Sequence, residues 1–174
     1  MAKVFLQRMG NLQFPLYFLV TMAALTGLYY TLPDWFIESV LVRFFAVIPG
    51  ATILDWMTPA YAVSSEQTRI ISPLVRLNVL KGCEGTEVLL ILYAAIFAVF
   101  RPLRYSLPGI LAGTLLVFVL NQLRIVALFF IAAYEKNLFE LVHGFLAPVV
   151  MIAAASGFFL LWMRWSESGR ASGP

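Results

Sequence analysis

Long stretches without a charged side chain constrain this sequence more than any other feature. The first stretch places 25 uncharged residues between Arg8 and Asp34, enough for a helix to cross the ~30 Å hydrocarbon core of a bilayer. The chain is 61% hydrophobic and only 12% charged, about half the charge of a typical soluble domain. So much apolar surface requires lipid, and the sequence therefore predicts an integral membrane protein.

The apolar stretches predict one all-α membrane domain over residues 1–174, with about four transmembrane helices. We interpret the first stretch as a retained span rather than a signal peptide, because it is long and no small-residue cleavage site follows before Asp34. A short polar loop is expected at residues 135–140, and a mobile tail at residues 164–174. The expected spans are residues 14–32, 83–100, 107–134 and 141–162.

Residues 34–82 form the predicted outer segment between the first two spans. Its most apolar part, residues 44–54, has only 11 residues and is interrupted by Pro49-Gly50. We expect this part to lie along the interface or to re-enter shallowly, because it is too short to cross. Residues 68–80 mix β-branched and polar side chains, a pattern typical of a small surface hairpin.

The positions of the basic residues predict the orientation. With four crossings, one side holds Lys3, Arg8, Arg101, Arg104, Arg164 and Arg170. Positive charge favours the cytoplasm, so we expect both termini inside a cell inner membrane and the outer segment outside. The sequence pI near 9.2 reflects basic residues that flank apolar stretches, and we expect no nucleic-acid partner.

Arg124 stands out because it lies inside an otherwise apolar predicted span. A charge there costs on the order of 3 kcal/mol even on lenient insertion scales, so it needs a cavity, a partner or a function. Asn121 is one helical turn earlier on the same face. The alternative interpretation is a structural ion pair of Arg124 with Glu84 or Glu87.

Cys83 is the only cysteine in the chain, which excludes an internal disulfide. We expect it at the outer start of the second span, where a helix N-terminus stabilises an anion and favours the thiolate. Gly82 and Gly85 on either side permit a tight turn that leaves the sulfur uncovered. Taken alone, Cys83 is more simply interpreted as an inert buried thiol.

His143 is the only histidine and begins the last predicted span at the same outer face. A histidine can carry protons near neutral pH, although it is equally common as an interfacial residue. With one cysteine and one histidine, a Cys/His metal site lacks ligands, and we predict no metal or other cofactor. A nucleophile, a proton carrier and a cation at similar depth are the parts that acyl transfer needs.

These residues resemble the motifs of the exosortase/archaeosortase family of membrane transpeptidases, over roughly residues 76–163. Cys83-Glu84-Gly85 is similar to the family's Cys-x-Gly at the head of a membrane helix, and Asn121-x-x-Arg124 to its Asn-x-x-Arg block. His143 matches the histidine that opens the last helix. The short length resembles the compact exosortase H type. The sequence departs from the family after the histidine, where Ala147-Pro148 replaces a glycine followed by an aromatic residue.

The resemblance implies a cysteine protease or transpeptidase that sorts exported proteins. Its substrates would end in a short motif, an apolar helix and a basic tail, docked from the surrounding membrane lipid. Cys83 would form the acyl-enzyme, Arg124 would stabilise the oxyanion or thiolate, and His143 would act as general acid and base. Asn121, Gly82, Gly85 and Glu84 would support them. The acyl group would pass to an unknown amine acceptor or to water.

Two other functions are open on the residues alone. A small transporter subunit would use Arg124 as an anion site and would tolerate loss of Cys83. A non-catalytic membrane assembly factor would tolerate changes at all three residues. The response to Cys83→Ala therefore separates the enzyme from both alternatives.

Overall fold

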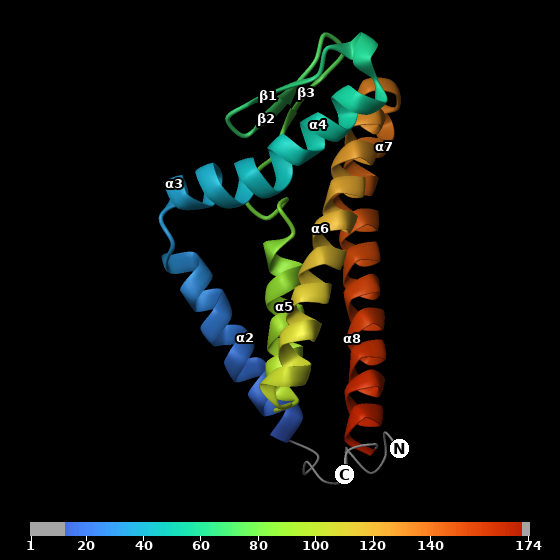
Figure 1. Ribbon diagram of the computed structural model, residues 1–174. Helices are drawn as coiled ribbons and strands as arrows, with labels where there is room; N and C mark the ends of the chain where they lie inside the picture. Colours follow the sequence, from blue (N-terminus) through green and yellow to red (C-terminus); the bar gives the residue numbers. More distant parts are fainter. Residues whose placement is uncertain (1–12, 172–174) are drawn as a thin grey trace.

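The computed structural model describes residues 13–171 as long helices with a small sheet at one end of the molecule (Figure 1). Lys3, Arg8 and the last residues of the predicted tail, 172–174, lie outside the described part. The elements in chain order are α2 (Gln13–Thr31), α3 (Asp34–Phe36), the π-helical η1 (Ile37–Val47), α4 (Ile48–Met57), the 3-10 turn η2 (Pro59–Tyr61), β1 (Ser64–Glu66), β2 (Arg69–Ile71), β3 (Arg76–Asn78), α5 (Thr86–Ala98), α6 (Leu103–Tyr134), α7 (Lys136–Leu141), the π-helical η3 (Val142–Leu146) and α8 (Ala147–Ala171).

Four helical segments within residues 13–171 are long and apolar enough to cross a membrane, which confirms the predicted fold class. They are Gln13–Thr31, Asp34–Met57, Leu103–Tyr134 and Lys136–Ser168. Three correspond to expected spans. The second expected span, residues 83–100, is shorter than predicted, because α5 begins at Thr86 and has 13 residues. It lies inside the bundle, packed on α2, α6 and α8.

The segment Asp34–Met57 corrects the prediction of an 11-residue apolar piece, because it is a helix of 24 residues. In Figure 1 it runs crosswise over the bundle rather than alongside α5 and α6. Pro49 does not break it. Pro49 has no N–H to offer the carbonyl of Phe45, and Gln122 Nε2 on α6 donates to that carbonyl instead, at 2.8 Å. The Gln122 side chain thus replaces the backbone hydrogen bond that the helix lacks at Pro49.

The predicted polar loop at residues 135–140 is also wrong. Only Glu135 separates α6 from α7, and α7, η3 and α8 continue as one helix from Lys136 to Ser168. The predicted mobile tail begins too early for the same reason, because α8 remains helical to Ala171. Its last part is held by an ion pair between Glu167 and Arg101, at 3.1 Å.

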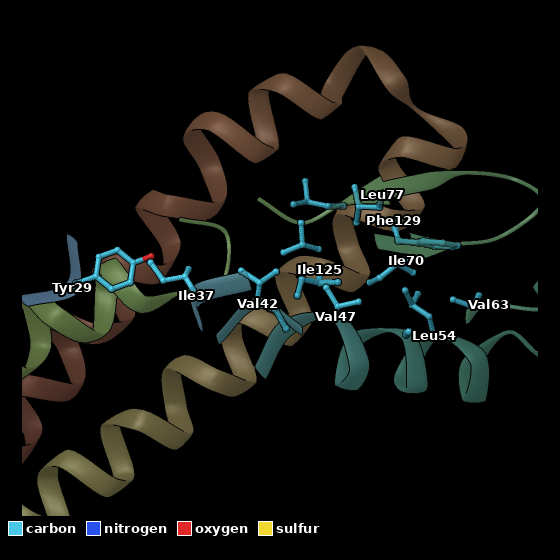
Figure 2. Close-up of a cluster of buried hydrophobic side chains, with 14 residues drawn as sticks. Tyr29, Ile37, Val42, Val47, Leu54, Val63, Ile70, Leu77, Ile125 and Phe129 are labelled. Carbon is cyan, nitrogen blue, oxygen red and sulfur yellow. The ribbon is translucent and has the colours of Figure 1, made fainter. Parts of the chain in front are cut away.

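The predicted surface hairpin is present and has a third strand. β1 pairs with β2, and β2 with β3, all antiparallel, so β2 lies in the centre. The buried side chains of Ile70 and Leu77 face each other across the last two strands. They join a cluster between the crosswise helix, the sheet and α6 that includes Val47, Ile125 and Phe129 (Figure 2). This cluster packs the sheet against the part of α6 that carries Ile125 and Phe129.

The opposite half of the bundle depends on close approach of α6 to its neighbours. Gly109 and Gly113 are one turn apart on α6, the small-residue spacing that lets membrane helices pack closely. A Cβ on Gly113 would come within 2.5 Å of Leu92 Cδ2 on α5, and one on Gly109 would overlap the Trp162 indole on α8. The indole nitrogen of Trp162 donates to the Tyr105 carbonyl at 3.0 Å.

Candidate active site

Cys83 lies in a tight turn between the sheet and α5. Its N–H donates to the Leu80 carbonyl at 2.9 Å. Gly82 and Gly85 both have positive φ, of 92° and 86°, a conformation that strains any other residue. The expectation that Cys83 begins the helix is therefore wrong. Gly85 is the N-cap of α5, so Cys83 precedes the N-cap by two residues and the thiol lies in the turn itself.

Glu84 fixes this turn from the inside. Its carboxylate is buried, with the residue only 7% exposed, and it accepts two short hydrogen bonds. The Tyr29 hydroxyl donates to Oε1 at 2.6 Å, and the Gly82 N–H donates to Oε2 at 2.6 Å. Hydrogen bonds to a charged acceptor are about twice as strong as neutral ones. Glu84 therefore joins the turn to α2 and holds the backbone beside Cys83.

Lys81 makes a second connection to the same corner. Its Nζ lies 3.5 Å from Asp34 Oδ1 and about 5 Å above the rings of Tyr29 and Tyr30. The Asp34 side chain is 83% exposed, so this ion pair contributes little stability. Lys81 and Glu84 thus connect the residues on both sides of Cys83 to the corner where α2 meets α3.

His143 approaches Cys83 from the other side. Its Nε2 lies 3.3 Å from the cysteine Sγ, within hydrogen-bonding distance for sulfur. The Phe139 ring, one turn earlier on α7, stacks on the imidazole with centroids 5.4 Å apart and an interplanar angle of 12°. Phe139 is thus a part of the site that sequence reasoning missed. Phe139 is four residues before His143, and this spacing indicates a contact between the two rings only if residues 136–141 are helical.

The helix that carries His143 is locally wider than an α-helix. In η3 the Ala147 N–H donates to the Val142 carbonyl, five residues back. Pro148 follows, and it cannot donate to the carbonyl of Gly144. The departure from the family pattern at Ala147-Pro148 thus coincides with a π-helical segment, a feature that often marks functional sites. The first π-helical segment, η1, likewise ends just before a proline, Pro49.

Arg124 lines the same pocket as Cys83 and His143. Its Nε is buried and has no hydrogen-bond partner within the described residues. The salt bridges found among those residues do not include Arg124 with Glu84 or Glu87. Glu84 is occupied by Tyr29 and Gly82, which disfavours the structural ion pair considered from the sequence. A guanidinium without a carboxylate in this position remains available to another anion.

Asn121 lies beneath the turn rather than beside the sulfur. It is 1% exposed, and neither amide atom has a hydrogen-bond partner among residues 13–171. A Cβ added to Gly85 would meet its Cγ at 3.5 Å. An unpaired buried amide costs about 1–3 kcal/mol. Asn121 thus lies within van der Waals reach of the Gly85 end of the turn.

The pocket itself is small and lies between β3, the Cys83 turn, α6, α7 and η3. Its volume is about 30 Å³, which leaves room for about two water molecules. Three of the sequence-predicted residues therefore meet at one cavity, whereas Asn121, Glu84, Gly82 and Gly85 form the support of the turn. The lining residues are Leu77, Asn78, Val79, Cys83, Arg124, Ile125, Leu128, Phe139 and His143.

Comparison with known proteins gives one match. A family model described as "Transmembrane exosortase" matches residues 6–165 of the chain. No match was found among curated proteins or among solved structures. The matched range includes every residue of the pocket and of the turn that supports it.

Proposed function

Because the chain belongs to the transmembrane exosortase family, we propose that it is a membrane-embedded cysteine protease or transpeptidase acting on exported proteins. Its substrates carry a C-terminal sorting signal, composed of a short motif, an apolar helix and a basic tail. The observation that carries this proposal is the 3.3 Å contact between Cys83 Sγ and His143 Nε2 in a pocket that Arg124 also lines.

The first half of the reaction forms a thioester. His143 Nε2 takes the thiol proton as Cys83 Sγ attacks the peptide carbonyl carbon. Negative charge develops on the carbonyl oxygen, and the Arg124 guanidinium stabilises it. The imidazolium then donates its proton to the departing amine as the C–N bond breaks, leaving the acyl group on sulfur.

The second half releases the acyl group. An incoming amine, or a water molecule, gives a proton to His143 as it attacks the thioester carbonyl. The C–S bond breaks and the thiolate recovers the proton, which restores the starting site. Transfer to an amine of a surface component yields a sorted protein, and transfer to water yields a cleaved one.

The distribution of charge supports an extracytoplasmic site in the inner membrane. Arg101 lies between α5 and α6, Arg104 in the first turn of α6, and Arg164 near the C-terminal end of α8. The junction of α5 with α6 and the end of α8 lie at the opposite end of the bundle from the sheet (Figure 1). Acidic residues outnumber basic ones at the end that carries the sheet and Cys83. Because positive charge marks the cytoplasmic side, the Cys83 pocket faces outward and both termini face inward.

The test follows cleavage of a tagged exported protein that ends in a motif, an apolar helix and a basic tail, encoded in the same genome. Cys83→Ala and Cys83→Ser should abolish its cleavage while the variants still insert and fold, because sulfur is the attacking atom. Wild-type protein should accumulate a tagged adduct that hydroxylamine releases. Cleavage by Cys83→Ala at the wild-type rate would exclude the cysteine mechanism and would favour the transporter or assembly-factor alternatives.

A further inference from the structure

The outer edge of β3 has backbone hydrogen-bonding groups that the sheet leaves unused. Ser72 N–H donates to the Val75 carbonyl at 3.0 Å, and Val79 N–H donates to the Thr68 carbonyl at 2.9 Å. Backbone groups along an antiparallel strand alternate in direction, so residues 75, 77 and 79 bond toward β2. The N–H and C=O groups of Arg76 and Asn78 therefore point away from β2. No further strand of the described sheet pairs with that edge.

This edge leads directly to the candidate nucleophile. Leu77, Asn78 and Val79 line the pocket that contains Cys83 and His143. Arg76 and Asn78, the two residues whose backbone groups face outward, are both exposed. A free strand edge thus ends at the place where a peptide bond would have to lie for attack by Cys83.

The size of the pocket limits what it can hold. A cavity of about 30 Å³ admits a carbonyl group but not a stretch of polypeptide. The residues that flank the cleaved bond must therefore lie outside it, along a surface that borders the pocket. β3 is such a surface, and its unpaired N–H and C=O groups match the backbone of an extended peptide.

We propose that an extended segment of the substrate, next to the bond that Cys83 cleaves, pairs with the outer edge of β3 as a fourth strand. This inference rests on the proposed function and specifies how that site binds its substrate. Hydrogen bonds to Arg76 and Asn78 position the segment through its backbone. Alternate side chains of the segment then face the side of the sheet on which Leu77 packs, and the others face solvent.

The substitution Asn78→Pro tests the outer edge of β3 without removing a backbone hydrogen bond between β3 and β2. Asn78→Pro removes an outward N–H, and proline is tolerated on an edge strand in that orientation. Asn78→Ala is the matched control, because both variants lose the side-chain hydrogen bond between Thr68 and Asn78 and only one loses the N–H. We expect KM for the tagged substrate to rise about tenfold in Asn78→Pro relative to Asn78→Ala, with kcat little changed.

A small thiol reagent reports whether the pocket itself is intact. Iodoacetamide should modify Cys83 at the same rate in both variants, because it does not need the strand edge. Equal KM values in Asn78→Pro and Asn78→Ala would overturn the proposal. Arg76→Pro and Arg76→Ala repeat the comparison at the other outward-facing position, and the same KM difference is expected there.

A proline scan of the substrate tests the same pairing with the wild-type enzyme, so it does not depend on how the enzyme variants fold. In the residues that flank the cleaved bond, proline should block cleavage at every second position, compared with alanine at the same positions. An effect without that alternation would rule out a paired strand. Failure of the proposed function can be told apart from failure of the strand pairing. Cleavage by Cys83→Ala would exclude the cysteine mechanism, whatever the result of the proline scan.

Discussion

Both ends of the molecule contain a cluster of buried apolar side chains, but they differ in the contacts added to it. Around the Cys83 turn, polar contacts join segments distant in sequence, such as Tyr29 with Glu84 and Cys83 with His143. In the opposite half, around Gly109 and Trp162, tight helix packing dominates. A hydrogen-bonded turn can be adjusted to place one sulfur atom, whereas a packed helix crossing sets the position of whole elements. Activity and stability should therefore respond separately to changes at the two ends.

Arg124→Lys should give the largest effect on activity. Lysine keeps the positive charge but replaces a planar fork of donors with a single ammonium group. Loss of an oxyanion donor lowers kcat by about 100-fold or more, and we expect a loss of that size in substrate cleavage, with Tm nearly unchanged. Arg104→Lys is the matched control, because Arg104 is exposed at the far end of the molecule. Equal cleavage rates for the two variants would contradict the role proposed for Arg124.

Substitutions at Glu84 should have the second-largest effect on cleavage. The size of this effect should depend on how many of its hydrogen bonds the new side chain keeps. Glu84→Leu leaves both the Tyr29 hydroxyl and the Gly82 N–H without their acceptor, and each unpaired group costs about 1–3 kcal/mol. We expect cleavage to fall by about 10-fold to 100-fold as the turn loses its fixed shape. Glu84→Gln keeps one acceptor and can donate to the Tyr29 oxygen, so most activity should remain. If Glu84→Gln were as inactive as Glu84→Leu, charge rather than hydrogen bonding would govern the turn.

Gly109→Ala tests the packed end. The new methyl group would overlap the Trp162 indole and displace its hydrogen bond to Tyr105. Overpacking costs about 1–3 kcal/mol, more than the ~1 kcal/mol that alanine gains over glycine in a helix. We expect a lower Tm in detergent but normal cleavage per folded molecule. Gly157→Ala is the control, since nothing lies within 4 Å of its new methyl group, and its Tm should rise slightly.

The sequence predicts three of the four long apolar helices among the described residues, and it fails where tertiary contacts replace local rules. Pro49 looks like a helix break, yet the helix Asp34–Met57 passes through it. For Pro49 the compensating donor is Gln122, 73 residues away, and no local pattern reveals it. Charged residues at 34–43 look like the end of an apolar segment, but they begin a helix of 24 residues.

The candidate site likewise contains residues that stand out in the sequence and residues that do not. Cys83, Arg124 and His143 are unusual residue types for a membrane segment, so each is visible in the sequence without knowledge of the fold. Tyr29 and Phe139 are ordinary aromatic residues in apolar stretches. Their importance comes only from a carboxylate 55 residues away and a ring stack on the histidine. Residues with unusual chemistry and their immediate neighbours in the sequence are predictable here, whereas distant aromatic residues that position them are not.

Asn121→Leu should have the smallest effect, and its sign is informative. The amide has no hydrogen-bond partner among the described residues, and leucine is of similar size, so removing the amide should stabilise the fold by about 1 kcal/mol. If Asn121 supports the Gly85 end of the turn only by its shape, cleavage should stay within a few-fold of wild type while Tm rises. A gain in Tm combined with a large loss of cleavage would instead mean that the amide contacts the substrate or a water molecule during the reaction. Asn121→Asp sharpens the choice, because a buried unpaired carboxylate should lower Tm even though its shape is nearly the same.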